Sequence, residues 1–537
     1  MKGVSLNIIL MSIILIYLVS SILIVTNYFK PSILLNKTIG ATTSTKVPTT
    51  TITRTTSSMT TTPITTSSIT TTTQSLGPGP GPTSTITTTT SIVNNCLNEC
   101  RRQGYLNGTC RSYVVDPDAL VCDSNEVNIG QIEDCKIESG LMGVGKTCCC
   151  GTDRIITQLT VAQDGSGNFT DIQSAIDYAY NLWGGTQKTI KIKSGTYVIN
   201  RYPNMKPYAG LVLPSNTVLQ GEPDVVIKEI KDGWMERLIT NEHSCVKDGL
   251  GNCTYQKTDY KDSNIVIKDL TIDGNRVNQS LPYNTGRNCV WFLNIKDVTI
   301  DNITFQNCAG SGITTTWASN VKTTNSNFLN NWGNGVYFDR TEDCALENNY
   351  LFGSNASNVD VYFAKRISIK NNIILNSTNG WGIDCDSVQF SNISNNVIGY
   401  NGRAGIVMWA DGGPNRRDHP EGGQRTYNNI ISNNEVFNND QLEEKPIEND
   451  YDGIDLSHNN AYGNYADHNI IENNKIYDNQ TIHTQRYTVG IGYPTDDYNV
   501  IRNNYYWGNI NNSVGIVWFF RGAADHTVIE NNFNHPP

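Results

Sequence analysis

The stretch Ser368-Ile369-Lys370-Asn371-Asn372-Ile373-Ile374-Leu375 decides the fold, because its arrangement recurs through the second half of the chain. A β-forming stretch is followed by an Asn-Asn doublet and usually by a second apolar stretch. A base period of about 23 residues, lengthened by insertions, is typical of a solenoid with one supersecondary unit per repeat. The doublets are Asn348-Asn349, Asn371-Asn372, Asn395-Asn396, Asn433-Asn434, Asn473-Asn474, Asn503-Asn504 and Asn531-Asn532, with the related pairs Asp301-Asn302 and Ser326-Asn327 upstream.

The repeating unit consists of strands. Its residues are β-branched and aromatic and show no helical periodicity, so each repeat should be one turn of short strands. We therefore predict an all-β protein, a parallel β-helix with coils of about 22–40 residues. Its Asn side chains would stack at one bend, where each amide bonds the coils on both sides and leaves no buried polar group unsatisfied.

The N-terminal part of the chain has a different composition. After a tail of residues 1–5, residues 6–27 form an almost uncharged apolar run, long enough for the ~20 residues that a membrane span needs. We predict a transmembrane anchor there. A cleaved signal peptide is the alternative, but its apolar core is normally ~7–15 residues long and ends in small residues.

A Thr/Ser/Pro-rich segment follows in residues 28–93. Such a composition has too few apolar groups to offset the cost of ordering the chain, so we expect a disordered stalk, which O-glycosylation would suit. Anchor and stalk together predict a single-pass membrane protein whose C-terminal part is extracellular or on a virion surface.

A cysteine-rich segment occupies residues 94–152 and contains eight of the fourteen cysteines. An even number in a short segment is typical of a disulfide-stapled module in an oxidising compartment. Zinc binding is the alternative, but two clean Cys-x2-Cys pairs are missing. The sequence does not choose among the pairings. The predicted disulfide cysteines are Cys96, Cys100, Cys110, Cys122, Cys135, Cys148, Cys149 and Cys150.

The net charge and the glycosylation sequons limit the classes of binding partner and the location of the protein. The formal net charge of −10 argues against nucleic acid, since binding phosphates needs a basic surface. Asn-x-Ser/Thr sequons are abundant and fit an extracellular glycoprotein. They include Asn107, Asn168, Asn252, Asn278, Asn355, Asn376, Asn392, Asn479 and Asn511.

The opening of the last domain, predicted to span residues 153–537, carries a family resemblance. The stretch Leu159–Asp177, with its Asp164-Gly165-Ser166-Gly167 turn, reads as strand, turn and amphipathic helix, and Gly195-Thr196-Tyr197 follows. This segment resembles the opening of pectinesterases and of other right-handed β-helices of the pectate-lyase superfamily. The resemblance implies a right-handed β-helix with an N-terminal helical cap over its open end. Later pectinesterase signatures are absent, so that activity does not carry over.

A second strand aligns across the coils about thirteen residues before each doublet. Its alternate positions are apolar, as in Ile383 and Cys385, and should face inward. The positions between them should face outward in two columns. The first column is Thr314, Tyr337, Asp360, Asp384, Val407, Asp455, Gly492 and Val517, and the second is Thr316, Asp339, Tyr362, Asp386, Trp409, Ser457, Pro494 and Phe519.

Three outward carboxylates, Asp360, Asp384 and Asp386, should gather on adjacent strands and are our candidate catalytic residues. Asp360 opposite Asp384, ~4.8 Å away between strands, should leave one carboxyl protonated beside an ionised one. Asp384–Asp386 and Asp360–Asp386 should lie roughly 7–8 Å apart. Paired carboxyls at about 5–5.5 Å or ~6.5–9.5 Å are the geometries of retaining and inverting glycosidases.

The candidate substrate-binding residues surround these carboxylates. Aromatic faces suit sugar rings, and long loops on a rigid scaffold commonly wall a cleft. The coils after Trp409 and after Asn439 are both enlarged. The candidates are Tyr337, Asp339, Tyr362, Trp409, Asp455, His458 and Arg416.

The acidic cluster is similar to that of the polygalacturonase family, which carries Asn-x-Asp in one coil and Asp-Asp in the next. Here Asn358-Val359-Asp360 precedes Asp384-Cys385-Asp386 by one coil. The resemblance implies Asp384 as general acid, with Asp360 and Asp386 activating water. Asp-x-Asp replaces Asp-Asp, however, Gly405-Ile406-Val407 stands where Gly-His-Gly is expected, and no Arg-Ile-Lys follows.

The leading functional hypothesis is a surface-anchored, polysaccharide-active glycoside hydrolase that needs no cofactor. A polysaccharide lyase is one alternative, in which the Asp cluster would bind Ca²⁺, although no basic residue stands in the outward columns. A non-catalytic glycan-binding adhesin is another, since anchor, stalk, disulfide module and solenoid need no catalysis. In each case the partner is a polysaccharide or a cell-surface glycan.

Overall fold

The computed structural model describes parts of the cysteine-rich module and most of the β-helix domain. The predicted anchor (6–27) and stalk (28–93) lie outside the described residues. Within the described part of the chain, no helix combines the length and apolar character needed to cross a membrane. Described are 96, 100, 108–114, 122, 126–128, 144–151 and 158–537, the last without 184–185, 203–208, 234, 248–252, 255–256, 280–286, 411–424, 443–451, 459–464, 512–514 and 523.

The cysteine-rich module contains an antiparallel sheet of β1 (Gly108–Val114), β3 (Val144–Gly151) and β2 (Glu126–Asn128), in that order. Three consecutive cysteines on β3 each form a disulfide, and alternation along the strand sends the middle one to the opposite face. The pairs are Cys96–Cys148, Cys100–Cys150 and Cys122–Cys149.

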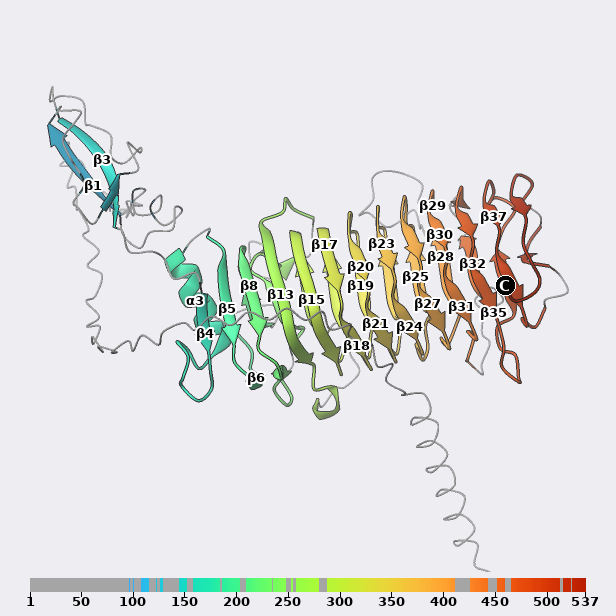
Figure 1. The fold of residues 1–537 in the computed structure, drawn as a ribbon, viewed down its shortest axis with the longest axis horizontal. Helices are drawn as coiled ribbons and strands as arrows, with labels where there is room; N and C mark the ends of the chain where they lie inside the picture. The colour runs from blue at the N-terminus through green and yellow to red at the C-terminus, as the bar shows by residue number, and fades with distance from the viewer. Residues whose placement is uncertain are drawn as a thin grey trace, which may run out of the picture. The chain divides into compact units, whose positions relative to one another are not determined.

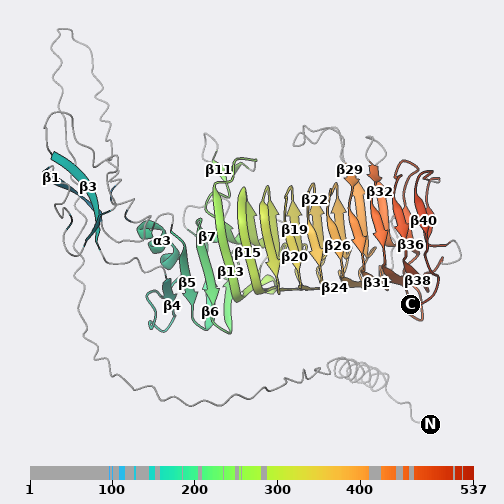
Figure 2. The same ribbon diagram turned by 45° about the horizontal axis from the view of Figure 1, so that its top comes forward.

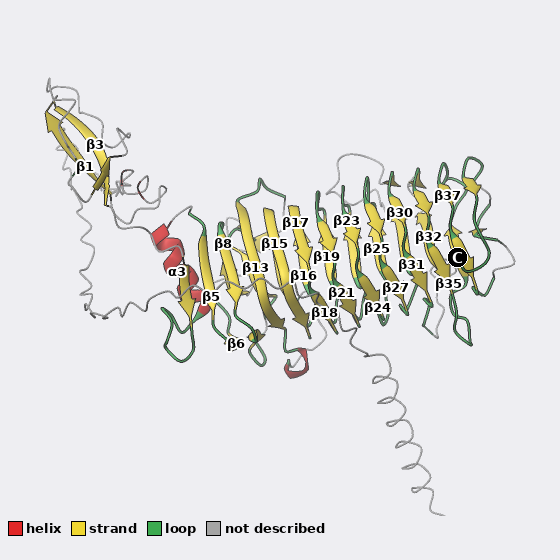
Figure 3. Cartoon of the chain, in the orientation of Figure 1, coloured by secondary structure: helices red, strands yellow, loops and turns green. Residues whose placement is uncertain are grey.

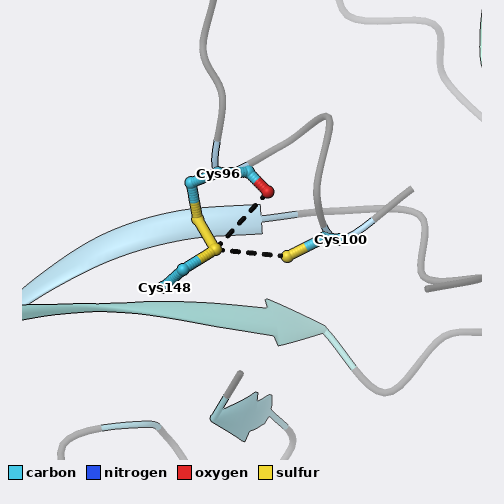
Figure 4. Close-up of side chains that lie close together, drawn as sticks. All are labelled: Cys96, Cys100 and Cys148. Atoms are coloured by element: carbon cyan, nitrogen blue, oxygen red, sulfur yellow. Dashed lines mark hydrogen bonds between the residues drawn. A yellow bond between two sulfur atoms is a disulfide. The ribbon is translucent and has the colours of Figure 1, made fainter. Parts of the chain in front are cut away.

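The predicted disulfide module is thus confirmed for six of its eight cysteines. Figure 4 shows the Cys96–Cys148 disulfide beside the Cys100 side chain. The Cys148 sulfur lies 3.5 Å from the Cys100 sulfur. The side chain of Cys110 and the whole of Cys135 lie outside the described residues.

Helix α3 (Ile172–Trp183) covers the first coil of the β-helix, as predicted (Figures 1 and 3). Asp171 begins the helix, and its carboxylate accepts a hydrogen bond from the Ser174 backbone at 2.7 Å. The apolar face of the helix is almost completely buried, at 0–1% exposure for Ile172, Ala175, Ile176 and Ala179. The open end of the solenoid core is therefore shielded from water at this side.

One wall of the β-helix is an 11-stranded parallel sheet, which Figure 2 shows as a continuous stack of coils. At ~4.8 Å between strands it runs for about 48 Å along the axis. In spatial order its strands are β39 (Val517–Phe519), β36 (Tyr487–Ile491), β32 (Asp452–His458), β28 (Ile406–Ala410), β25 (Ile383–Asp386), β22 (Val359–Tyr362), β19 (Val336–Asp339), β16 (Ile313–Thr316), β14 (Asn288–Leu293), β10 (Arg237–Asn241) and β7 (Ala209–Leu213).

The other walls are also parallel ladders. One runs from the long strands β13 (Asp262–Asp273) and β15 (Ile295–Gln306) through β17 (Ser319–Thr324), β20 (Ala345–Glu347), β23 (Ser368–Lys370), β26 (Asn392–Ser394), β30 (Ile430–Ser432), β34 (Ile470–Glu472) and β37 (Val500–Arg502) to β40 (Val528–Glu530). The next runs through β18 (Asn327–Leu329), β21 (Tyr350–Phe352), β24 (Ile373–Leu375), β27 (Val397–Gly399), β31 (Glu435–Phe437), β35 (Lys475–Tyr477) and β38 (Tyr505–Trp507).

The first coils contribute β4 (Gln158–Val161), β5 (Lys188–Ile192), β6 (Gly195–Ile199), β8 (Thr217–Gly221) and β9 (Val225–Glu229). Small additions are β11 (Val246–Lys247) with β12 (Cys253–Thr254), the 3-10 turn η2 (Arg276–Asn278), and β29 (Arg425–Tyr427) with β33 (Tyr465–Asp467). The β11–β12 hairpin lengthens its coil, so that Asn216 bonds Asn264, 48 residues later. The predicted upper limit of about 40 residues per coil was therefore too short.

The two residues of each doublet have different tasks. The first adopts left-handed backbone, as at Asn371 with φ 56°, and bends the chain. The second is buried and joins the predicted amide ladder: Asn372 donates to the Asn396 side chain at 3.0 Å and to the Leu346 carbonyl at 2.8 Å, and it accepts from the Asn349 backbone at 2.9 Å. Donor and acceptor capacity are both used, which is why Asn recurs here.

Candidate active site

The outer face of the 11-stranded sheet carries the predicted acidic cluster. On β22 and β25, Val359, Val361, Ile383 and Cys385 point into the core at 0–1% exposure, so the residues between them face outward. Asp360 pairs with Asp384, and Tyr362 pairs with Asp386. The structure thus brings Asp360, Asp384 and Asp386 onto neighbouring strands of one face, and we call these three residues the acid column.

Asp360 is the best-defined member of the acid column. Its Oδ2 accepts a hydrogen bond from Asn334 Nδ2 at 2.9 Å, and Asn334 is held in turn by the Ser357 backbone N–H, which donates to Asn334 Oδ1 at 3.0 Å. Burial raises the pKa of Asp360 well above its usual range, and the charges of Asp384 and Asp386 raise it further, while the Asn334 bond opposes the shift. Asp360 therefore holds a proton more readily than an ordinary aspartate does.

Asp386 lies in a different setting, although it is only two residues from Asp384. Ser387 Oγ donates to its Oδ1 at 3.1 Å, and its partner on the next strand is Trp409. Beneath both carboxylates, burial raises the pKa of the Cys385 thiol well above its usual range, and the three aspartates raise it further. The thiol is thus a neutral core group.

Aromatic side chains border the acid column, as predicted. Tyr337 pairs with Asp360 from the preceding strand, and burial, followed by the charges of Asp339 and Asp360, raises the pKa of its phenol. Tyr362 packs edge-on against Phe363, with ring centroids 4.1 Å apart. The Tyr337 phenol therefore stays neutral, and both tyrosines present apolar ring surface beside the acids.

A turn of left-handed residues ends these strands and was not predicted as part of the site. Trp317, Arg340, Phe363 and Ser387 have φ between 49° and 58°. Arg340 binds both carboxylate oxygens of Asp339 at 2.8 Å and lies over the rings of Trp317 and Tyr362, 5.5 and 5.8 Å from their centroids. The sequence signal is their shared position, directly after each outward-facing strand.

The opposite edge of the site carries Trp381, which was also missed. It stands three residues before Asp384, is partly buried, and has the Arg403 guanidinium 4.6 Å from its ring centroid. Arg403 Nε donates to the Asn379 carbonyl at 3.2 Å. Two arginine–aromatic pairs thus border the acid column, one at each end of its strands.

Several predicted residues do not join the surface. Asp455 belongs to the same outward column, but it is 0% exposed, and Val407 stands between it and Asp384. Asp339 is 7% exposed, and its carboxylate forms an ion pair with Arg340. The amide of Asn358, in the motif shared with polygalacturonases, is bonded to the Asn401 side chain within the core. Arg416 and the side chain of His458 lie outside the described residues.

The register of the last coils also differs from the prediction. Asp455 pairs with Gly490 instead of Gly492, and Gly490 pairs with Trp518 instead of Val517. By analogy with Gly382 and Gly453, which directly precede Ile383 and Ile454, the sequence pattern predicts that Gly490 begins its strand. The structure places Val489, the preceding residue, in the core opposite Ile454. A pattern read from glycine alone therefore misplaced these two coils by two residues and by one.

Two groups of described residues bring three metal-binding atoms within 4.8 Å of one another. One consists of Cys96, Cys100 and Cys148, which are in disulfides. The other consists of Glu242, His243 and Asp262 beside β10 and β13. The Asp262 carboxylate is already bonded by Asn241 Nδ2 and the His243 backbone, both at 2.7 Å. Neither group belongs to the acid column.

Comparison with known proteins agrees with the architecture. A family model described as "Right handed beta helix region" matches residues 252–416 and 316–475. No curated protein sequence matches the chain. The prediction of a right-handed parallel β-helix protein is confirmed.

Solved structures with similar folds have low sequence identity to this chain. The A-module of mannuronan C-5 epimerase AlgE4 from Azotobacter vinelandii is 18% identical, with a TM-score of 0.43 over 67% of this chain and 94% of the module. A family 28 exopolygalacturonase of Yersinia enterocolitica is 13% identical, at 0.40 over 74% and 81%. A tailspike protein mutant of E. coli bacteriophage HK620, solved with a pentasaccharide, is 15% identical, at 0.46 over 71% and 67%.

Proposed function

We propose that this chain acts on polysaccharides and that its acid column hydrolyses glycosidic bonds. One observation carries the proposal: Asp360, with its raised pKa, pairs directly with Asp384 and lies diagonal to Asp386 on the outer face of a rigid sheet. Glycoside hydrolysis needs a carboxylic acid to protonate the leaving oxygen and a carboxylate to attack or to activate water. The acid column offers aspartate side chains for both roles, the protonated acid and the ionised carboxylate.

The spacing of the strands supports the same reaction. With ~4.8 Å between strands and ~3.3 Å per residue, Asp360 and Asp386 are about 8 Å apart on the diagonal. That distance falls within the ~6.5–9.5 Å window of inverting glycosidases, which leaves room for a water molecule. The rings of Tyr337, Tyr362 and Trp409 next to these carboxyls suit the C–H faces of sugars, and Trp381 extends that surface.

The experiment is an assay of reducing-sugar release by the full chain on a panel of acidic and neutral polysaccharides. Ultraviolet absorbance of unsaturated products, with and without added Ca²⁺, is followed in parallel. We expect release without unsaturation, and its loss in Asp386→Asn. Unsaturated products would favour the Ca²⁺-dependent lyase. Binding of a glycan without any release would favour a non-catalytic adhesin and would refute hydrolysis.

We further propose that the chain is displayed on a cell or virion surface by the predicted anchor and stalk. The three disulfides of the neighbouring module fit an oxidising compartment. The test compares the full chain with a variant lacking residues 1–27. We expect only the full chain to sediment with membranes and to be cut by protease added outside intact cells. Equal recovery of both in the soluble fraction would refute the anchor.

A further inference from the structure

We infer that Asp360 gives the proton to the leaving group and Asp386 activates the water, with Asn334 as the residue that positions Asp360. The inference rests on the proposed hydrolase function and deepens it. It departs from the roles implied by the polygalacturonase resemblance, in which Asp384 would be the acid. Its basis is that the three carboxyls have different neighbours.

Asp360 is oriented by contacts on one side only of its carboxyl group. Asn334 Nδ2 donates to Oδ2, and the Asn334 amide cannot turn around without losing the bond from the Ser357 N–H to its Oδ1. Asn334 is itself fixed by its backbone N–H, which donates to Ser311 Oγ at 3.2 Å. With Oδ2 committed as an acceptor, Oδ1 is the oxygen that can carry a proton toward a substrate.

The charged groups around Asp360 favour a proton there. Tyr337 and Asp339 face it from β19, and Asp384 and Asp386 face it from β25. One cation on this side, Arg340, binds Asp339 through both carboxylate oxygens. Asp360 thus faces two other carboxyl groups across the strands, and this arrangement favours the neutral form of Asp360. Burial and these charges raise the pKa of Asp360, in agreement with the geometry.

Asp386 is suited to the complementary role. Its Oδ1 accepts a hydrogen bond from Ser387 Oγ, and its strand partner is the aromatic residue Trp409. It is also the carboxylate diagonal to Asp360, about 8 Å away by strand geometry. Asp384, directly opposite Asp360, supplies the negative charge that holds the proton in place.

The reaction balances with these roles. Asp360 transfers its proton to the glycosidic oxygen, and the bond from the anomeric carbon to that oxygen breaks with its electron pair going to the departing sugar. A water molecule forms the new bond to the anomeric carbon from the opposite face and gives a proton to Asp386. Water is the sole co-reactant, and exchange with solvent returns both carboxyls to their starting forms.

Leaving-group dependence tests the assignment. Asp360→Asn, Asp384→Asn and Asp386→Asn are assayed on the cleaved polysaccharide and on the matching 2,4-dinitrophenyl glycoside, whose leaving group needs no proton. Asp360→Asn should lose about 10²–10⁴-fold on the polysaccharide and stay within about 10-fold of wild type on the activated glycoside. Asp386→Asn should lose both activities. The assignment would be overturned if the activated glycoside restored hydrolysis by Asp384→Asn and did not restore hydrolysis by Asp360→Asn.

The stereochemistry of the first product tests the second role. Proton NMR of the newly released anomer should show inversion, because water attacks from the face opposite the leaving group. Retention would mean that a carboxylate attacks directly and would remove Asp386 as the base.

The positioning role of Asn334 has its own readout. Its hydrogen bond lowers the pKa of Asp360, so Asn334→Ala should move the alkaline limb of the pH–rate profile to higher pH. The control Asn327→Ala removes an exposed amide bonded to Thr304 and should leave the profile in place. Equal profiles for Asn334→Ala and wild type would refute the positioning role, whatever the loss in rate.

A titration that needs no activity separates this inference from the proposed function. Carbon-13 NMR of labelled aspartate, with Asp360→Asn identifying the signal, should show Asp360 titrating above the ordinary value of about 3.9. Titration of Asp360 at or below that value would refute the inference. Wild-type protein that cleaves no polysaccharide would instead sink the proposed function, even with Asp360 protonated.

Discussion

Like side chains are stacked on like at a bend and on a wall of the same solenoid, with opposite results. In the amide ladder, Asn349, Asn372, Asn396 and Asn434 each bond the next residue in the series at 3.0 Å or less. In the acid column, Asp360 and Asp384 occupy equivalent positions on adjacent strands. Both stacks follow from the same coil-to-coil spacing.

The difference lies in the hydrogen-bonding capacity of the two side chains. An amide is donor and acceptor at once, so a stack of amides satisfies itself and holds the coils in register. An ionised carboxylate only accepts, so two of them stacked repel each other until one takes a proton. The same coil-to-coil stacking therefore yields stability at the bend and a carboxyl that favours its protonated form on the wall.

The largest effect is expected when the acid column is turned into an amide stack. Asp360→Asn/Asp384→Asn should lower hydrolysis by at least about 10²–10⁴-fold, because the proton donor is gone. At pH values above 7, the free energy of unfolding of this variant should be higher than that of the wild type, since the repulsion is removed. Rate assays and urea unfolding of the same preparation check both. A variant that is both inactive and less stable would contradict the comparison.

The amide ladder is broken by a single substitution. Asn434→Ala removes the acceptor of Asn396 N–H and Nδ2 and the donor to the Ile393 carbonyl, so the free energy of unfolding should fall by about 3 kcal/mol.

Its matched control is the other half of the doublet. Asn433→Ala keeps the ladder and alters only an exposed residue with φ 56°, at a cost of about 1 kcal/mol. Chemical denaturation of both variants gives the two values, and equal losses would show that the ladder contributes nothing beyond the bend.

A buried carboxylate outside both stacks separates burial from repulsion. Glu229 faces Arg287 at 3.3 Å, and burial raises the pKa of Glu229 to about 7 from 4.5, although Arg287 lowers it. The folded state therefore binds this proton more tightly, so the contribution of Glu229 to the free energy of unfolding is greatest below about pH 4.5 and falls by up to about 3 kcal/mol as the pH rises past 7. Glu229→Gln should flatten that slope.

The comparison for Glu229 is Glu222→Gln, which removes a surface pair with Lys191. An exposed pair of this kind contributes ~0–1 kcal/mol, so the slope should persist. Unfolding measured from pH 4 to 8 distinguishes the two variants. A slope unchanged by Glu229→Gln would show that the Arg287 pair fully offsets the cost of burial.

The smallest effect concerns the repulsion by itself. Asp384→Asn leaves Asp360 in place and removes one opposing charge, so the free energy of unfolding should increase by about 1 kcal/mol near pH 8. The pKa of Asp360 is raised, so Asp360 is protonated at low pH and its carboxyl does not repel Asp384 there. The gain in the free energy of unfolding should therefore shrink toward pH 4. Thermal unfolding at the two pH values checks this. A gain that is equal at both would assign the effect to packing.

The sequence predicted most of the fold because the amide ladder is both local and periodic. A residue that bends the chain, followed by one that bonds the next coil, fixes where every turn falls, and the columns from Thr314 to Asp455 were therefore in register. Where glycine was the guide, near Gly490, the register was wrong, since glycine fits either face of a strand.

The sequence by itself determined that Asp360, Asp384 and Asp386 share one wall, because alternation and period need no knowledge of neighbouring coils. Only the tertiary structure decided which acidic residues are accessible: Asp455 is in the same column but fully buried, and Asp339 is bound by Arg340. Exposure, ion pairing and the position of a proton depend on side chains from other coils, and no local pattern encodes their distances.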